Sequence, residues 1–323
     1  MPLNRRQLIA ASAAAATVGL PAYGQGSFPN KLIKIVVPYP PGGSSDIIAR
    51  SISQQLSENL GQTVVVENRA GANGNLGADL VAKSAPDGHT LLLCDVGALA
   101  ISPSVYTRLS FDPSKDLRGV TMLAYSPHML AVHPSVKANN LKELVALSKT
   151  SDINFAVTAV GSAPHVAGVA VERATGAKWI YVPYKGGAQA VADTIAGQTQ
   201  VIMNGMLATL PSVQNGRLKV LGISKKTRMP LVGEVPTLSE QGVTDFESGT
   251  WQGVVVPRGT PAAIVARLNA ELIKVIRSPD VRARLTGQGA EVVTMQPAEQ
   301  DAFFERERKR WGAVVAAANI KLD

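Results

Sequence analysis

The sequence predicts an α/β protein with two lobes, each built on a mostly parallel sheet that is flanked by helices. The chain has 323 residues, which exceeds one domain of average size. Strands alternate with helices over residues 32–94 and again over residues 153–203, a pattern typical of parallel sheets covered on both faces. The extended segments 122–133 and 218–224 are expected to cross between the lobes and form a two-strand hinge.

The first unit starts at residue 32. An apolar, β-branched segment over 32–37 predicts a strand, and an isoleucine or leucine at every fourth position predicts a helix over 46–60. Gly61 is the expected end of that helix. The unit continues with an expected strand over 63–67, a glycine-rich turn over 68–74, a helix over 75–84 and a strand over 90–94.

A second unit of the same kind occupies the middle of the chain. It comprises expected strands over 153–157, 179–182 and 201–203 and expected helices over 165–175 and 188–196. Because the last third of the chain is expected to return to the first unit, we assign residues 26–124 and 225–323 to lobe 1 and residues 125–224 to lobe 2. The cleft is then expected at the carboxyl ends of both sheets.

Residues 1–24 are predicted to be an export signal and not part of the fold. Arg5 and Arg6 precede the mildly apolar run Ala10–Leu20, and small residues over 22–24 offer a cleavage site. The paired arginines make the segment a candidate for twin-arginine export. Its removal would delete two arginines and no acidic residue, which lowers the net charge by two, from +8 to +6. We therefore expect the mature protein in the periplasm, with its signal peptide removed.

The composition excludes several classes of protein. The chain is 46% hydrophobic and 17% charged, which is typical of globular proteins, and no later run approaches the roughly 18 apolar residues of a membrane span. Lys and Arg are scattered, and the densest run, Arg306–Arg310, contains a glutamate, so nucleic acid is not an expected partner. Cys94 is the only cysteine, so no intramolecular disulfide can form, and its place after three leucines predicts a buried thiol.

The junction between the first strand and the first helix is the leading candidate site. Pro38–Asp46 contains Gly42, Gly43, Ser44 and a second serine, which leave backbone N–H groups free and allow a ligand to come close. A helix N-terminus with unpaired N–H groups binds anions readily. This junction therefore predicts an anion-binding loop.

Two other motifs suggest enzymes and fit them poorly. Gly71–Gly77 is glycine-rich, but two residues separate its first and second glycines where the dinucleotide fingerprint has one. Ser162 does not lie in a Gly-x-Ser-x-Gly elbow, and His165 is too close to it in sequence to form a separately supported triad. No cluster of His, Asp and Glu has metal-ligand spacing. We predict no catalytic residue, no metal site and no cofactor.

The second lobe has a loop that matches the first. Thr158, Gly161 and Ser162 precede a helix, as the glycine-serine loop precedes the first helix. Charge-assisted hydrogen bonds to a carboxylate contribute about 1.5–3 kcal/mol each. Two lobes that close on one carboxylate would couple binding to closure.

Several motifs, in order along the mature chain, resemble those of the Bug family, the periplasmic solute-binding proteins of tripartite tricarboxylate transporters. They are Pro38–Asp46 with Ala49 and Arg50, Asn68–Gly77, Val182–Gly187, Val235–Gly242, and Trp251–Gly253 before Pro257–Pro261. The resemblance implies a type II, Venus-flytrap periplasmic binding protein without enzymatic activity. Such a protein captures a small organic carboxylate between its lobes and delivers it to membrane permease subunits. We expect it to act as a monomer.

The resemblance also implies a set of ligand-binding residues. One jaw would contain Tyr39, Pro41, Gly42, Gly43 and Ser44, the other would contain Thr158, Val160, Gly161, Ser162 and His165, and Asn75, Asp95, Val96 and Asn204 would line the cleft. This chain departs from the family's usual pattern in three places. Ala156, Ala159 and Val160 stand where glycine is commoner, Asp95, Val96 and Ala98 where Thr or Ser is common, and Asn204 where Asp is common. These departures leave the loop geometry and the ligand open.

Two alternatives to transport also stay open. A periplasmic sensor that feeds a two-component system would present the same cleft, and surface residues outside the cleft would decide between the two. An enzyme on the same fold is the other alternative.

The role of Asp95 also stays open. If Asp95 is ionised and faces the cleft, it would repel a second carboxylate of the ligand or attract an amine or hydroxyl. Otherwise it bonds a neighbouring backbone N–H.

Overall fold

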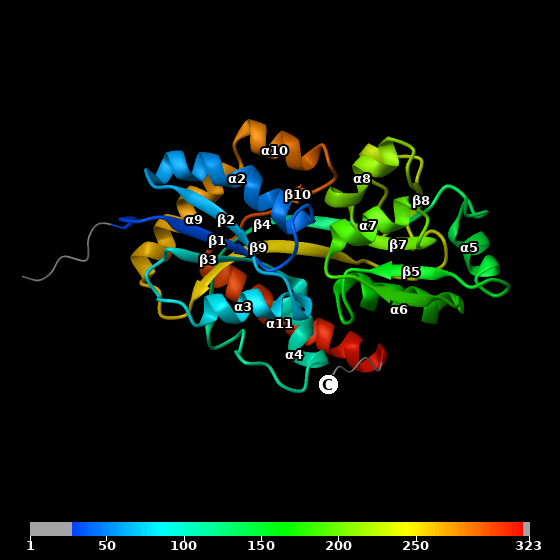
Figure 1. Cartoon of the computed structure of the whole chain (residues 1–323), viewed down its shortest axis with the longest axis horizontal. Helices are drawn as coiled ribbons and strands as arrows, with labels where there is room; N and C mark the ends of the chain where they lie inside the picture. The colour runs from blue at the N-terminus through cyan, green and yellow to red at the C-terminus, as the bar shows by residue number, and fades with distance from the viewer. Residues whose placement is uncertain (1–27, 319–323) are drawn as a thin grey trace, which may run out of the picture.

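The computed structural model describes residues 28–318, and the export signal predicted over 1–24 lies outside them. These residues form two lobes side by side, with the ends of the chain mainly in one lobe and the middle in the other (Figure 1). The main path of paired strands is β2-β1-β3-β9-β4-β7-β5-β6. A single long strand, β4, belongs to the sheets of both lobes.

Lobe 1 contains the first unit and the C-terminal part of the chain from β9 onward. Its strands are β1 (Ile33–Val37), β2 (Val64–Asn68), β3 (Thr90–Asp95), β9 (Gly249–Pro257) and β10 (Glu291–Val292). Its helices are α2 (Ser44–Leu60), α3 (Asn75–Ala82), α4 (Ser102–Val105), α9 (Ala262–Ile276), α10 (Pro279–Thr286) and α11 (Pro297–Ala318). β1 is parallel to β2 and β3, whereas β9 is antiparallel to β3 and β4.

Lobe 2 repeats this arrangement on a smaller scale. Its strands are β5 (Asn154–Val157), β6 (Ile180–Pro183), β7 (Val201–Gly205) and β8 (Lys219–Ile223), and its helices are α5 (Leu141–Leu147), α6 (Ala163–Thr175), α7 (Gly187–Ile195) and α8 (Met206–Gln214). β5, β6 and β7 are parallel, but β7 and β8 are antiparallel to β4. Each sheet is mixed but mostly parallel, as predicted: β9 and the short β10 run against the other strands of lobe 1, and β4 runs against those of lobe 2. The predicted elements of both units are present, with ends within two residues of those expected.

The hinge is built on β4 (Leu117–Val132), whose first part pairs with β9 and whose last residues pair with β7 and β8. The segment predicted as the second crossing strand, 218–224, instead stays within lobe 2, because β8 pairs with the lobe 2 end of β4 and Ile223 forms a bridge with Thr237. The chain returns to lobe 1 at β9, whose first residue Gly249 pairs with Pro127. Buried His128 fixes this crossing, since its Nδ1 and Nε2 lie 2.8 Å from Ser248 Oγ and 3.0 Å from Thr250 Oγ1.

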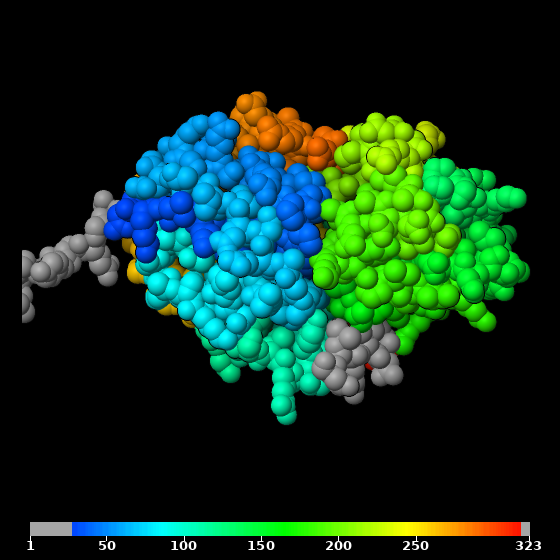
Figure 2. Space-filling model, in the orientation of Figure 1, coloured from blue at the N-terminus to red at the C-terminus, as the bar shows by residue number. Residues whose placement is uncertain are grey.

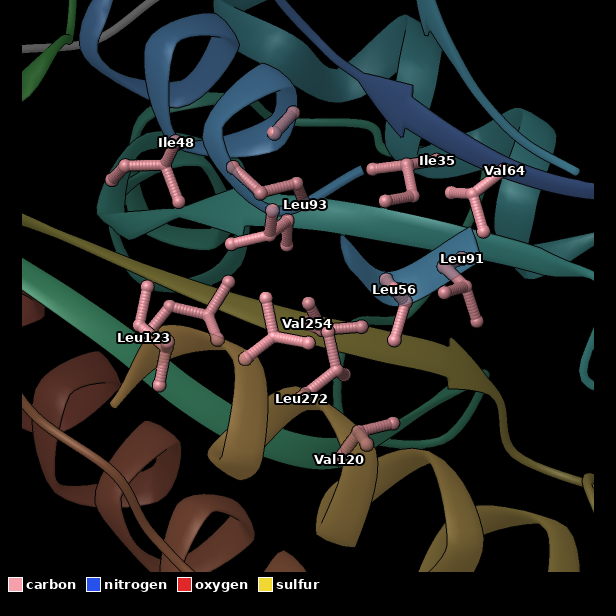
Figure 3. Packing of buried hydrophobic residues seen from close by; sticks show 14 of the residues in the cluster. Ile35, Ile48, Leu56, Val64, Leu91, Leu93, Val120, Leu123, Val254 and Leu272 are labelled. Carbon is pink, nitrogen blue, oxygen red and sulfur yellow. The ribbon is translucent and has the colours of Figure 1, made fainter. Parts of the chain in front are cut away.

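The buried face and the C-terminal end of α2 both follow from its sequence. Ile48, Ile52 and Leu56, four residues apart on α2, are completely buried, as their periodicity predicts. They belong to the same cluster as Leu91 and Leu93 of β3 and as residues of α9 (Figure 3). Gly61 ends the helix in the left-handed conformation, which glycine adopts without steric cost. The sheet and this helix therefore position the β1–α2 loop that joins them.

The segment between β8 and β9 was assigned to lobe 1 from the sequence. Its apolar side chains Leu238, Val243 and Phe246 pack with Leu130 and Phe155 in the core of lobe 2. Backbone hydrogen bonds from Ile223 to Pro236 and from Leu238 to Ile223 attach the segment to β8. We propose that lobe 2 extends to about residue 248 and that the boundary at 224/225 is too early.

Candidate ligand-binding site

A cavity lies between the lobes, at the carboxyl ends of their parallel strands. It offers about 50 Å³ to the centres of water-sized molecules, which is room for a few water molecules or a small ligand. Of the residues predicted from the sequence, it is lined by Tyr39, Gly43, Ser44, Asp95, Thr158, Ser162 and Asn204. The cavity thus brings together both loops that the sequence singled out.

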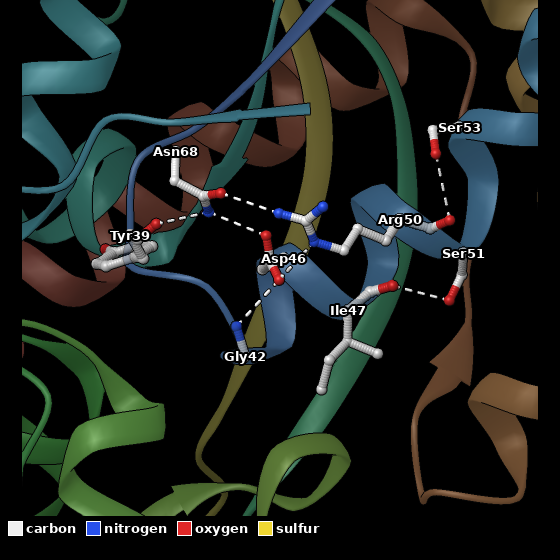
Figure 4. A network of polar contacts seen from close by, with 8 residues as sticks. All are labelled: Tyr39, Gly42, Asp46, Ile47, Arg50, Ser51, Ser53 and Asn68. Atoms are coloured by element: carbon white, nitrogen blue, oxygen red, sulfur yellow. Dashed lines mark hydrogen bonds and ion pairs between the residues drawn. The ribbon is translucent and has the colours of Figure 1, made fainter. Parts of the chain in front are cut away.

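A network around Asp46 fixes the loop that forms the lobe 1 wall (Figure 4). The carboxylate of Asp46 accepts hydrogen bonds from Gly42 N (3.0 Å), Arg50 Nε (3.0 Å) and Asn68 Nδ2 (2.9 Å). Asn68 Nδ2 also donates to Tyr39 O (2.9 Å). Burial alone would raise the pKa of Asp46, but the bonds from Arg50, Gly42 and Asn68 outweigh it and lower that pKa. Asp46 is therefore ionised, holds the loop in place and leaves the cavity to other groups.

Asp95, at the end of β3, is the acidic residue of the cavity. It is 8% exposed, and its Oδ1 accepts hydrogen bonds from Tyr39 Oη (2.9 Å) and from Gly97 N (2.9 Å). Burial raises the pKa of Asp95 to about 6, although the bonds from Tyr39 and the backbone oppose that rise. From the sequence, Asp95 was expected either to face the cleft or to accept a hydrogen bond from a neighbouring backbone N–H. In the structure it does both.

The lobe 2 wall of the cavity is the loop before α6. Hydrogen bonds of Ser162 and His165 fix the conformation of this loop. Ser162 Oγ donates to Ala159 O (2.7 Å) and accepts from His165 N (3.4 Å), as the N-cap of α6. His165 Nδ1 accepts from Gly161 N (3.0 Å), and its ring packs edge-on against Tyr181. Burial lowers the pKa of His165 to about 4, so this histidine is neutral and acts as a support for the loop.

Replacing Ser162 with alanine should lower the free energy of unfolding by about 1 kcal/mol, because the N-terminal N–H of α6 loses its side-chain acceptor. The exposed Ser151, which lies in the same lobe, provides a matched control as Ser151→Ala. Denaturant unfolding of both variants measures the difference. Equal stability of the two variants would remove Ser162 from its capping role.

Helix N-termini from both lobes surround the cavity. α2 begins after Gly43 and α7 after Gly186, and neither N-cap has a side-chain hydrogen bond within the described structure. Gly43, Ser44 and Gly187 line the cavity, so backbone N–H groups of both helices are available to a ligand. Unpaired N–H groups and the positive end of the helix dipole favour an anion at this place.

The two lobes are in contact on the face that Figure 2 shows, and contacts between residues of the two lobes indicate a closed form. Asn73 Nδ2 of lobe 1 donates to Gly161 O of lobe 2 (3.2 Å). A Cβ on Gly186 would lie 2.7 Å from Pro40 Cδ, and a Cβ on Gly42 would lie 3.3 Å from Ala188 Cβ. Glycine at these positions allows the two loops to approach closely.

The other predicted residues lie outside the cavity. Val96 is buried in the core of lobe 1, Pro41 and Gly42 are exposed, and buried Asn75 is the first residue of α3. Gly161 and His165 stabilise the second loop through their hydrogen bond, and Val160 lines a neighbouring hollow with Tyr39, Tyr106 and Tyr184. The prediction assigned whole motifs to the ligand, whereas neighbouring residues such as Asp95 and Val96 point in different directions, one to the cavity and the other to the core.

Other lining residues were not predicted. They are Ser45, Asn73, Gly97, Ala163, Pro164, Gly187, Thr250 and Gln252. Gln252 pairs directly with Asp95 between β3 and β9, and it is completely buried with both side-chain amide atoms unpartnered among residues 28–318. In the sequence, the Trp251–Gly253 motif was the feature that could have indicated Gln252 as a cavity residue.

The model of the tripartite tricarboxylate transporter family receptor matches residues 48–320. The chain belongs to this family. BugT of Bordetella pertussis is 36% identical over 311 residues, which cover 95% of each chain. Family members are periplasmic solute-binding proteins, so the resemblance to the Bug family and the two-lobed fold predicted from the sequence are both confirmed.

Two solved structures of relatives contain ligands. R. palustris Rpa4515, solved with adipate, has a TM-score of 0.88 and 31% identity, with 91% of this chain and 99% of that chain covered. MatC from Rhodopseudomonas palustris, solved with bound malate, has a TM-score of 0.84 and 32% identity, with 89% of this chain and 100% of that chain covered. In this chain, no helix between residues 28 and 318 is both long enough and apolar enough to cross a membrane.

Proposed function

We propose that this protein is a periplasmic receptor that captures a small organic carboxylate between its lobes and delivers it to the permease subunits of a tripartite tricarboxylate transporter. The observation that carries this proposal is the pair of uncapped helix N-termini, one from each lobe, that face a single cavity. Relatives of similar length were solved with adipate and malate, which are carboxylates. The family itself is one of transporter receptors.

Closure follows from the same geometry. A carboxylate at the N-terminus of α2 accepts hydrogen bonds from lobe 1 alone while the lobes are apart. When they approach, the N-terminus of α7 and Ala163 of α6 add donors from lobe 2. Because only the closed form provides both sets, the ligand shifts the population toward it. The permease can then distinguish the loaded receptor from the empty one by its shape.

Thermal unfolding of the exported mature protein against mono-, di- and tricarboxylates tests the binding role. A ligand at a hundred times its dissociation constant should add about 2.7 kcal/mol to the free energy of unfolding. This corresponds to a rise of several degrees in Tm. Gly43→Trp should abolish the rise, because the indole would occupy the N-terminus of α2, where Gly43 lines the cavity.

Stabilisation that survives Gly43→Trp would place the carboxylate elsewhere, and no stabilisation by any carboxylate would contradict the proposal. Turnover of the bound compound would support an enzyme instead. Delivery is tested separately, by uptake into membrane vesicles that contain the permease subunits. Uptake that does not depend on the added receptor would exclude a transport role and leave a sensor.

A further inference from the structure

The residues that line the cavity fall into two groups that differ in chemistry. The first group consists of helix N-termini that provide N–H donors: Gly43 and Ser44 at α2, Gly187 at α7 and Ala163 at α6. The first turn of α6 contributes little more, since Pro164 has no N–H and Ser162 already caps the helix. This group is suited to a single anionic group of the ligand.

The second group, Asn73, Asp95 and Gln252, is rich in hydrogen-bond acceptors. Asn73 is 5% exposed, and since its Nδ2 donates to Gly161 O, its unpartnered Oδ1 is an acceptor. Asn73 Oδ1 and Asp95 Oδ1 each lie 3.1 Å from the position of a Cβ on Gly97, so the two oxygens are close together. Gln252, directly opposite Asp95 across β3 and β9, adds a completely buried amide with no partner in the described structure.

Nothing in the cavity wall balances the charge of Asp95. Among the described residues that line the cavity, none is Lys, Arg or His, and Asp95 is the acidic one. Its hydrogen bonds come from a tyrosine hydroxyl and a backbone N–H, which carry no charge. A buried carboxylate is costly unless a cation pairs with it. The missing cation is therefore expected from the ligand.

We propose that the ligand is a small zwitterion, whose carboxylate lies at the helix N-termini and whose protonated amine lies between Asp95, Asn73 Oδ1 and the amide oxygen of Gln252. The inference rests on the proposed carboxylate-binding function and adds the second group that the cavity recognises. An ammonium has three donors and no acceptor, so it satisfies these three oxygens at once. A second carboxylate in the same place would meet the like charge of Asp95 and the acceptor Asn73 Oδ1, which the amide N–H groups of Gln252 would offset only in part. Asp95 is therefore the specificity-determining residue.

Titration calorimetry with matched probes tests this inference. The probes are ω-amino acids, α,ω-dicarboxylates, ω-hydroxy acids and plain monocarboxylates, each with chains of two to six carbons, so that length and end group vary independently. At pH 8 we expect the best amino acid to bind at least ten times more tightly than the best dicarboxylate. Asp95→Asn should lower the amino-acid affinity at least tenfold and raise that of the dicarboxylate. Asp152→Asn, at an exposed residue of lobe 2, should change neither.

The outcomes separate the two proposals. If carboxylates bind but dicarboxylates or hydroxy acids bind more tightly than amino acids, the zwitterion inference is overturned and the carboxylate function stands. If Asp95→Asn leaves the order of the four series unchanged, Asp95 does not select the ligand and the inference also fails. If no carboxylate of any series binds, both proposals fail together.

Discussion

Replacing Asp95 with asparagine should raise the free energy of unfolding of the ligand-free protein by about 3 kcal/mol at pH 8. Burial raises the pKa of this carboxyl from 3.8 to about 6, so the folded protein binds its proton more tightly than the unfolded chain. Stability therefore falls as the pH rises from about 4 to above 6, by about 1.4 kcal/mol per unit of pKa shift. Asparagine is nearly isosteric, keeps an acceptor for Tyr39 and Gly97, and carries no charge to bury.

The same comparison at low pH identifies the cause. Near pH 4 the folded protein holds Asp95 protonated, so the two proteins should differ by less than about 1 kcal/mol. Other titratable groups close to Asp95 do not mask this effect, because each of them is present in both proteins. Burial raises the pKa of Tyr39, Cys94 and Tyr106 and lowers that of His165. Denaturant unfolding between pH 4 and pH 8 measures the difference. A variant less stable than the original at pH 8, or a difference that does not depend on pH, would contradict this account.

This cost of Asp95 is informative because selection for stability alone would remove it. A strained or uncompensated group at a cleft is an expected sign of function. In the ligand-bound protein, a protonated amine would supply the partner that the protein lacks. The difference between the two proteins should therefore shrink when a zwitterion is bound.

Local sequence patterns were sufficient to predict the helices and strands of the two units of the fold. The four-residue spacing on α2 and the left-handed Gly61 are signals within about one helix length, and each has a direct structural cause. The incorrect prediction that residues 218–224 cross between the lobes shows the limit of such local signals. β8 and a crossing strand look alike in sequence, because both contain an apolar, extended segment, and the pairing partner distinguishes them.

The candidate site was predictable in part for the same reason. Gly43, Ser44 and Ser162 stand at junctions of strand and helix, which the sequence reveals directly. Gln252 and Thr250 enter the cavity through the antiparallel pairing of β9 with β3 and β4. That pairing joins residues more than 120 positions apart, so no local pattern contains it. Motif reasoning also could not tell Asp95, which faces the cavity, from Val96, which faces the core.

Replacing Gly186 with alanine should lower the affinity for any ligand of the cavity about tenfold, with little change in the stability of the ligand-free protein. Gly186 has an extended backbone, with φ near 169°, so alanine adopts its conformation without strain. Its Cβ would lie 2.7 Å from Pro40 Cδ in the opposite lobe. Overpacking of this kind costs about 1–3 kcal/mol. Because the contact exists only when the lobes meet, the cost applies to closure and to binding, and leaves the separate lobes unchanged.

Calorimetry and thermal unfolding of the same variant separate closure from folding. Gly233→Ala is the matched control, since Gly233 is exposed, has a φ of −53° and would place its Cβ an ordinary 3.7 Å from Pro230 O. The control should match the original protein in both measurements, whereas Gly186→Ala should bind weakly and unfold at nearly the original temperature. Unchanged affinity in Gly186→Ala would mean that the ligand-bound lobes stand further apart than in this structure. The cavity between the N-termini of α2 and α7 would then be larger when the ligand is bound, and the zwitterion would span it with a longer chain.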